Sequence, residues 1–242
     1  MTMKKILWET LRRPEVEEAA KAGAIVIIPV ASIEQHGNHL PVNTDTNCCL
    51  TIAHRAAQAI EEFPVLVLPP IWTGYSPHHM PYPGSITLQY NTFVEVLTQV
   101  ATSVYAHGFK KILFLNGHYG NSPVIAAMRT KLAAEEGVSA IGYNYWDLAS
   151  VLDEMKRVSQ SDKGFVGHSG EIETSLELYL QPELVDRQAA TWVPGVWGDP
   201  STGMREKGER IINVAVSSLV KLLRDYYSGA LEDKLVWRKE VL

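Results

Sequence analysis

The sequence predicts an α/β fold in which helices cover both faces of a parallel sheet, and two observations predict it. Apolar segments of strand length alternate along the chain with longer segments in which apolar residues recur at helical spacing. The apolar segments also lack the strict polar and apolar alternation of a half-exposed strand, which indicates burial on both faces. Because no internal repeat or linker interrupts the 242 residues, we expect residues 1–242 to form one domain.

The strands and helices are expected in regular alternation. The expected strands are the apolar segments 24–30, 65–71, 110–117 and 138–144. The expected helices are 46–62, 91–108, 122–137, about 170–180 and 208–229. Gly108 and Gly137 end the second and third helices, because glycine readily adopts the left-handed conformation that follows a helix. Helical crossovers thus join the successive strands, as a parallel sheet requires.

The composition excludes several classes of protein. The chain has 22 Lys and Arg against 27 Asp and Glu, a net charge of −5, which argues against the basic surface that binds nucleic acid. Its longest apolar run, AGAIVIIPVA, is too short to span a bilayer, and no such run follows the N-terminal lysines as in a signal peptide. The two cysteines, Cys48 and Cys49, are adjacent, and adjacent cysteines rarely close a disulfide. We therefore expect a cytoplasmic protein.

Four loops carry most of the polar residues that could do chemistry. Loops 31–45, 71–86 and 116–122 follow expected strands, and segment 162–173 precedes an expected helix. Ligands of open α/β sheets collect at the carboxyl ends of the strands, in the loops that lead to helices. We therefore expect these four segments to converge in space.

The first loop contains the sequence VASIEQHGNHLPVNTD. Glu34 and His36 are two residues apart, so an extended chain places their side chains on one face. Asp45 follows a turn marked by Gly37 and Pro41 and stands where the next helix begins. Two carboxylates and an imidazole are suitable ligands for Zn²⁺, Mn²⁺ or Fe²⁺. In the alternative interpretation Asp45 caps the helix and the histidine belongs to a solvated loop.

The loop after the third expected strand reads FLNGHYGNSP. It places His118 between Gly117 and Gly120, two residues that permit tight turns and close approach to a ligand. The G-x-x-x-x-G-K pattern of a phosphate-binding loop is absent. In the alternative interpretation His118 is an exposed residue of a turn in which Asn121 or Ser122 caps the helix.

The segment GHSGEIETSLELYL offers one histidine and two glutamates ahead of an amphipathic helix. Its apolar stripe consists of Ile172, Leu176, Tyr179 and Leu180. At about 100° per residue, Glu173 lies closer to this stripe than Glu171, so we expect Glu173 to be the more buried carboxylate. A buried carboxylate needs a partner, and a metal ion is one. The alternative is that both glutamates only favour the helix dipole.

Together the loops predict a pair of metal ions. The candidate ligands are Glu34, His36, Asp45, His118 and Glu173. Five ligands exceed the four of a structural zinc site and suit two divalent ions bridged by one carboxylate. Asp45 is the expected bridge, with Glu34 and His118 on one ion and His36 and Glu173 on the other. A water shared by two ions would be a nucleophile near neutral pH.

Two further histidines of these segments have other expected roles. His168 lies outside the ligand set, and its ordinary pKa of about 6.5 suits a general acid or base. His39 is assigned to the wall of the loop rather than to the metal ions.

The motifs SIEQHGNHLPVNTD, PGSITL, NGHYGN, YWD and HSGEIETS resemble the creatininase (creatinine amidohydrolase) family over nearly the whole chain. The resemblance implies a three-layer α/β/α domain with a mostly parallel sheet, assembled as a homohexamer. It implies a binuclear centre of two divalent ions (Zn, Mn or Fe) to which Glu34, His36, Asp45 and His118 are ligands. It also implies that His168 transfers protons and that Glu173 is the catalytic glutamate of the last motif.

The resemblance implies a metal-dependent hydrolase in which a metal-bound water attacks a carbonyl or amide carbon of a small cyclic substrate. The expected bond is the C–N bond of a cyclic amide. Other family chemistries act on a formamide, a peptide or a cyclic diketone. A non-catalytic oligomer that binds a small molecule is the alternative of a different class.

The chain departs from the family pattern at informative positions. Gly120 stands where creatinine-hydrolysing members have a glutamate that binds the second ion, so Glu173 is expected to supply that carboxylate. His78 replaces the glutamate of an S-x-E-H pattern, which changes the pocket wall. The residues expected to bind substrate are Ser76, His79, Ser85, Tyr119 and Trp146. Trp146 matches a substrate-stacking tryptophan of the family, but it is equally well interpreted as a buried structural residue. Segment 192–208 is interpreted as a loop that forms part of the pocket or of an oligomer contact.

Overall fold

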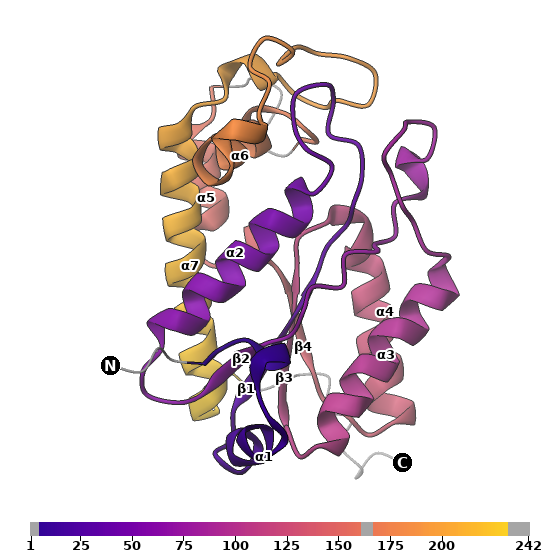
Figure 1. The fold of residues 1–242 in the computed structure, drawn as a ribbon, viewed down its shortest axis with the longest axis vertical. Coiled ribbons are helices and arrows are strands. Elements are labelled where there is room, and N and C mark those ends of the chain that lie inside the picture. The colour runs from indigo at the N-terminus through magenta and orange to yellow at the C-terminus, as the bar shows by residue number, and fades with distance from the viewer. Residues whose placement is uncertain (1–4, 161–166, 232–242) are drawn as a thin grey trace.

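The computed structural model describes residues 5–160 and 167–231 and contains a four-stranded parallel sheet (Figure 1). Its strands are β1 (Ile25–Val30), β2 (Val65–Val67), β3 (Lys111–Asn116) and β4 (Ile141–Asn144). Their order is β2-β1-β3-β4, and each neighbouring pair is parallel. The four predicted strands are therefore confirmed. The second is shorter than expected because Pro69 and Pro70 cannot donate ladder hydrogen bonds.

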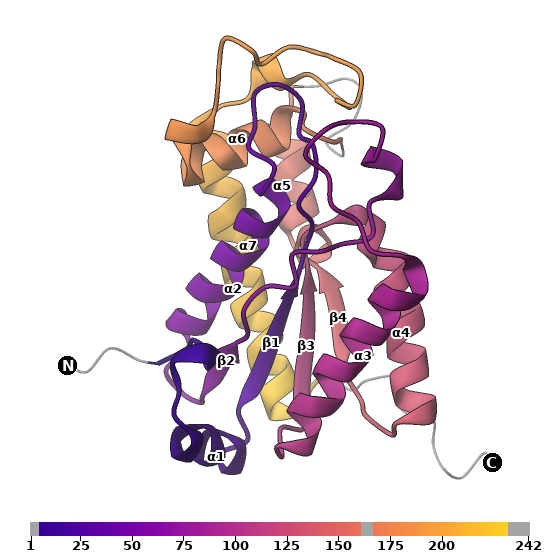
Figure 2. The same ribbon diagram turned by 45° about the vertical axis from the view of Figure 1, so that its right-hand side comes forward.

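Helices cover both faces of the sheet. On one face lie α2 (Thr44–Ala59), α5 (Val151–Val158), α6 (Glu171–Leu180) and α7 (Arg205–Ser228) (Figures 1 and 2). On the other face lie α3 (Tyr90–Ala106) and α4 (Ser122–Glu135), with α1 (Arg13–Lys21) near the amino ends of the strands. The short 3₁₀ helices are Trp8–Thr10, Pro77–His79, Tyr119–Asn121, Tyr145–Asp147, Pro182–Leu184 and Pro200–Thr202.

Strands β1, β2 and β3 each supply side chains to two separate hydrophobic cores. In β1, Ile25 and Ile27 belong to the core shared with α2 and α7, whereas Val26 and Ile28 belong to the core shared with α3 and α4. Successive side chains of a strand point to opposite faces, so a wholly apolar strand fills both cores. The predicted three-layer α/β/α arrangement is confirmed. None of the helices among the described residues is long and apolar enough to cross a membrane.

Two helices, α1 and α5, were not predicted. No residue of α1 is fully buried, and its apolar face is only the short stripe Val16, Ala19 and Ala20. The carboxylate of Glu15 accepts from the amide of Arg12 at 2.7 Å and so supports the first turn. Helix α5 is only eight residues long. Its buried side includes the charged Glu154, which pairs with Arg157 and Arg210. This charged residue interrupts the apolar pattern by which a helix is predicted.

The connections create a switch point between β1 and β3. Helix α2 leaves β1 on one face of the sheet, and α4 leaves β3 on the opposite face (Figure 2). The two strands end in register, with Val30 opposite Asn116, and the amide of Gly117 donates to Val30 O at 2.8 Å. Open α/β sheets bind their ligands in the crevice that such a divergence leaves. The loops after β1 and β3, both expected to carry ligands, therefore begin side by side.

Helices α6 and α7 pack backbone against backbone. A Cβ at Gly208 of α7 would overlap the carbonyl group of Ser175 in α6. Beside this contact the ammonium group of Lys207 donates to the carboxylate of Glu171 and to Thr202 O. The contact fixes α6, which carries Glu173, against the rest of the molecule.

Gly208→Ala should therefore lower the free energy of unfolding by about 3 kcal/mol, because two helix backbones must separate to admit the methyl group. Urea denaturation measures this change. Asn213→Ala, on the exposed side of the same helix, is the control and should change stability by less than about 0.5 kcal/mol. Equal effects of the two substitutions would show that the close approach of the helices is not what stabilises them.

Candidate metal centre

The loop after β1 brings its carboxylate and imidazole into the interior. Glu34 and His36 are fully buried, and the amide of Glu34 donates to Val42 O at 3.0 Å, which closes the loop on itself. Gly37 allows the turn, because its φ of +68° is in the left-handed region. The loop therefore points Glu34 and His36 at the start of α2.

Asp45 lies within the first turn of α2, because the helix begins at Thr44 with Asn43 as its N-cap. The alternative in which Asp45 is the N-cap is therefore wrong. Its Oδ1 lies 3.3 Å from His36 Nε2, and its Oδ2 lies 3.0 Å from His118 Nδ1. Two ligands about 2.1 Å from a tetrahedral ion are separated by about 3.4 Å, so both distances suit atoms that share an ion. The two oxygens of Asp45 thus face two different groups of donors.

The five expected ligands form two overlapping groups. Glu34, Asp45 and His118 offer ligand atoms that all lie within 4.8 Å of one another, and so do His36, Asp45 and Glu173. Asp45 is common to both, which is the arrangement expected for a bridging carboxylate. Glu34, His36 and His168 form a third group of the same kind, so His168 borders the centre.

Backbone carbonyl groups orient each of the three histidines. His36 Nδ1 lies 3.1 Å from Glu34 O, and His118 Nε2 lies 3.2 Å from Tyr75 O. His168 Nε2 lies 2.7 Å from Gln35 O. A carbonyl oxygen only accepts, so these nitrogens carry a proton, and the other ring nitrogen faces the centre, where that of His36 or His118 can bind a metal ion once it is deprotonated. Metal-binding histidines are held in this way.

Several buried polar atoms of the centre lack a hydrogen-bond partner. They are both carboxylate oxygens of Glu34, His36 Nε2 and Asp45 Oδ2. Leaving such atoms unpaired in a buried site is costly, particularly for carboxylates. Because all four belong to candidate ligands, two divalent cations fit the residues present.

The charges of the centre favour cations. Burial lowers the pKa of His118, but the adjacent carboxylates of Asp45 and Glu34 outweigh it and raise that pKa to about 10. Burial also lowers the pKa of His36. The carboxylates of Asp45 and Glu173 outweigh this effect and raise that pKa well above its usual value. Burial raises the pKa of Glu173, but His36 lowers it to about 2. Without metal, protons on the histidines balance the carboxylates.

Glu173 reaches the centre although its side chain is 18% exposed. Its Oε2 lies 3.7 Å from His36 Nε2 and accepts a hydrogen bond from the amide of Ser169, whose φ is +57°. The expectation that Glu173 is more buried than Glu171 is wrong, because Glu171 is only 3% exposed. Glu171 faces α7 and pairs with Lys207, a partner that the apolar stripe of α6 did not reveal.

Gly120 cannot simply be replaced by the glutamate found in relatives. A Cβ there would lie 2.5 Å from His118 Nε2 and would overlap Tyr75 O. The space beside His118 is therefore filled by the groups that orient its ring. Besides Asp45, Glu173 is a carboxylate that lies close to His36 among the described residues.

Three of the five residues expected to bind substrate contact the centre or its loop. Ser76 Oγ lies 3.1 Å from His118 Nε2, and His79 Nε2 lies 3.4 Å from Glu34 Oε1. Ser85 Oγ accepts from the amide of Gln35. These contacts make Ser76 and Ser85 supports of the centre and leave His79 at its edge.

The other two residues expected to bind substrate lie apart from it. Tyr119 is 74% exposed at the rim. Trp146 is partly buried against the core of α2, α6 and α7, with its ring edge-on to Tyr145 at 5.0 Å. This placement fits the interpretation of Trp146 as a structural residue. His39 also lies aside, with Nε2 2.9 Å from Thr174 Oγ1.

Sequence reasoning missed two amides that join the loops. Gln35 Nε2 donates to Gly195 O at 2.8 Å and lies 3.0 Å from His79 Nδ1, while Gln35 Oε1 accepts from the amide of Gly37. Asn121 Nδ2 donates to Ala31 O at 3.0 Å, and its Oδ1 accepts from the amide of Tyr75. Both residues stand inside motifs already singled out, and only the fold reveals their partners. The first five residues of segment 162–173 lie outside the described residues.

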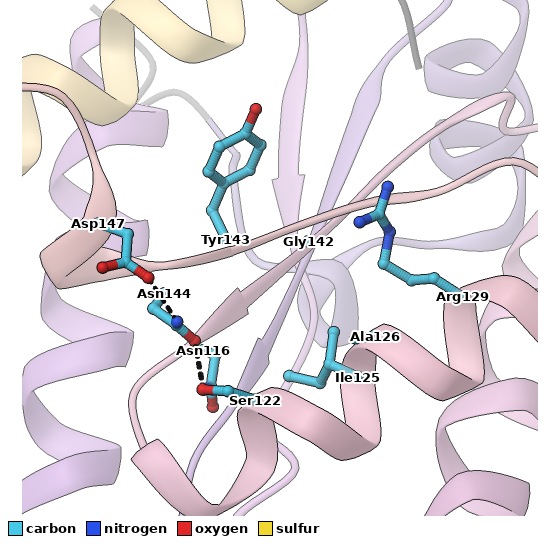
Figure 3. Close-up of a pocket in the computed structure, with 9 residues that line it drawn as sticks. All are labelled: Asn116, Ser122, Ile125, Ala126, Arg129, Gly142, Tyr143, Asn144 and Asp147. Carbon is cyan, nitrogen blue, oxygen red and sulfur yellow. Dashed lines mark hydrogen bonds between the residues drawn. The ribbon is translucent and has the colours of Figure 1, made fainter. Parts of the chain in front are cut away.

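A separate pocket of about 280 Å³ lies beside β4 and the start of α4, and none of the five candidate ligands lines it (Figure 3). Its polar groups bind one another: Asn144 accepts from Ser122 at 2.9 Å and donates to Asp147 at 2.6 Å. Asn116 donates to Asn144 and to His118 O, both at 2.7 Å. The network therefore supports the backbone at His118 from behind.

Comparison with known proteins identifies relatives of several activities. The family model described as creatininase, creatinine amidohydrolase, matches residues 9–223. A creatinine amidohydrolase of Pseudomonas putida is 28% identical, covering 88% of this chain and 94% of its own length. A 3-dehydro-scyllo-inosose hydrolase of Thermotoga maritima is 31% identical, covering 76% and 59%. A mycofactocin precursor peptide peptidase of Mycolicibacterium smegmatis is also 31% identical, covering 77% and 79%.

Solved structures of creatininase share the fold, and two of those compared are described with a metal. One crystal structure of creatininase superimposes with a TM-score of 0.83 at 27% identity, covering 93% of this chain and 98% of the other. A mutant creatininase of the Zn–Zn type gives 0.81 at 26% identity, covering 93% and 99%. A creatininase described with Mn gives 0.77 at 26% identity, with the same coverage.

Asp45→Asn should remove both metal ions, because each oxygen of the native carboxylate faces its own donor group. His36→Ala should remove about one ion per chain, since His36 belongs to the group with Glu173. Elemental analysis after gel filtration measures the metal content, and circular dichroism checks the fold. Retention of two ions by Asp45→Asn would contradict the bridging arrangement.

Metal binding at pH 7.5 should release about two protons per chain. The pKa values of His36 and His118 are raised in the metal-free protein, so both rings are protonated there and must lose a proton to become ligands. Affinity should therefore fall as pH falls. Calorimetry with Zn²⁺ in buffers of different ionisation enthalpy counts the protons, and binding without proton release would show that the histidines are not ligands.

Proposed function

The chain belongs to the creatininase family, and from this premise we propose that it is a binuclear metal-dependent hydrolase that opens a small cyclic amide. The observation that carries the proposal is the double-sided placement of Asp45. Its Oδ2 lies with Glu34 and His118, and its Oδ1 lies with His36 and Glu173. Two divalent ions held there would polarise a carbonyl group and lower the pKa of a water molecule. The Zn–Zn and Mn structures of relatives support zinc or manganese as candidates.

His168 is placed to move the proton that hydrolysis requires. Its Nε2 is held by Gln35 O, so its Nδ1 carries the lone pair and lies 3.5 Å from Glu34 Oε1 at the edge of the centre. Burial and the neighbouring charge of His36 lower the pKa of His168, which keeps the ring neutral at physiological pH. A neutral imidazole can accept a proton from water at Nδ1 and then donate it to the leaving nitrogen.

The remaining residues of the centre orient its candidate ligands. His79 Nδ1 accepts from Gln35 Nε2, and this bond turns His79 Nε2 toward Glu34 Oε1, which lies 3.4 Å away. Burial lowers the pKa of His79 to about 4, so it remains a neutral donor. Hydrolysis adds hydroxide to the carbonyl carbon and a proton to the nitrogen, which yields a carboxylic acid and an amine; the acid proton then passes to the amine, so that the products are a carboxylate and an ammonium group.

The relatives act on chemically different substrates, so the branch must be found by assay. The panel is creatinine and hydantoin as cyclic amides, a formamide, a short peptide and a cyclic 1,3-diketone. We expect turnover of at least one cyclic amide by protein loaded with Zn²⁺ or Mn²⁺. No turnover across the panel by protein that holds two ions per chain would favour a non-catalytic binding protein.

His168→Asn should lower kcat on the substrate found by about 10²–10⁴-fold, because the proton acceptor is lost. The metal content should stay at two ions per chain, since His168 lies outside the two groups that share Asp45. His107→Asn, an exposed histidine at the end of α3, is the matched control and should leave kcat unchanged. Unaltered kcat in His168→Asn would assign the proton transfer to another group.

A further inference from the structure

Trp197 holds a large apolar side chain in solvent beside the centre. Its side chain is 78% exposed, and it lies in a segment, residues 192–198, that carries a second exposed tryptophan, Trp192. The segment lies at the end of the molecule where the carboxyl ends of the strands and the loop 31–43 are found (Figures 1 and 2). An exposed indole at such a place can supply a large apolar contact area to a ligand.

The backbone of Trp197 is paired with that of His168. The amide of His168 donates to Trp197 O at 2.9 Å, and the amide of Trp197 donates to His168 O at 2.7 Å. Residues that exchange both hydrogen bonds in an antiparallel pair carry their side chains on the same face, with Cα atoms about 5.5 Å apart. Because the imidazole of His168 points to the centre, the indole of Trp197 stands beside it on the solvent side.

Further contacts fix the segment on either side of this pair. Gly195 O accepts from the side-chain amide of Gln35 at 2.8 Å. Val196 packs against Gly37, where a Cβ would lie only 2.8 Å from Val196 Cγ2. The loop that supplies Glu34 and His36 therefore also holds the backbone of Trp197. A rigidly mounted indole offers contact area at little entropic cost.

Three segments that contribute residues around the centre carry no charged side chain. Segments 63–94, 112–128 and 188–198 contain no Asp, Glu, Lys or Arg. They include the exposed Met80, Ile86 and Tyr119. Recognition of a phosphate or a carboxylate uses Arg or Lys, which these segments lack. The uncharged side chains of these segments therefore suit a substrate with a planar, uncharged group.

We infer that Trp197 is a specificity-determining residue whose indole stacks on a planar, uncharged ring of the substrate while the scissile carbonyl lies at the metal centre. The inference rests on the proposed function for the place of the substrate. It names the substrate class as cyclic amides or imides with an extended flat face.

Phthalimide and succinimide test the inference, because both are five-membered cyclic imides and only phthalimide has a fused aromatic ring. The dissociation constants of both are measured by equilibrium dialysis with the metal-loaded full chain, and hydrolysis is followed separately. Wild type should bind phthalimide about tenfold more tightly than succinimide. Trp197→Ala should reduce this ratio below about threefold, and Trp197→Phe should restore part of it. Trp192→Ala, on the same segment, should leave the ratio unchanged.

The outcomes separate this inference from the proposed function. An equal ratio in wild type and Trp197→Ala, or no binding of either imide by wild type, overturns the inference. A smaller oligomer of Trp197→Ala by light scattering, with the ratio unchanged, overturns it in favour of a contact between copies of the chain. If the ratio depends on Trp197 but no panel compound or imide is hydrolysed, the proposed function fails and the stacking role stands.

Discussion

The carboxylate of Asp45, held between two histidines in the first turn of α2, is the contact on which the rest of the centre depends. The amino end of a helix carries partial positive charge, which favours a carboxylate there even when it is buried. The close approach of α2 to the loop of His118 requires Gly117. A Cβ at that position would lie 2.6 Å from Cys49 Cβ and 2.7 Å from Asp45 O. The register of β1 against β3, the glycine and the helix start thus act together to bring Asp45 to both histidines.

The polar groups of the centre lower the stability of the metal-free protein. Unpaired oxygens of Glu34 and Asp45 and the unpaired nitrogen of His36 are costly in a buried site until a cation binds them. The surroundings compensate with a rigid frame of backbone carbonyl groups and amide side chains. The two cores of the sheet, and the backbone contact between α6 and α7, hold that frame in place. Such a site is preorganised for cations rather than shaped by them.

Much of the fold, and the convergence of the candidate ligands, could be predicted from the sequence, for identifiable reasons. Strands buried on both faces are apolar throughout, so β1 and β3 are evident, and parallel topology places the ends of such strands together. Glu34, His36, Asp45 and His118 stand at those ends. The burial of Glu171 could not be predicted, because its partner Lys207 is on a helix 36 residues away in sequence. The role of Gln35 depends on Gly195. The apolar stripe of α1 consists only of Val16, Ala19 and Ala20, too short a pattern to predict a helix.

The central claim is that two divalent ions share Asp45. Anomalous diffraction from crystals of the zinc-loaded protein, recorded on both sides of the zinc absorption edge, tests it most directly. The account predicts two anomalous peaks per chain, about 3.5–4 Å apart, with one carboxylate oxygen of Asp45 directed at each. A single peak, or two peaks of which one has no contact with Asp45, would contradict it.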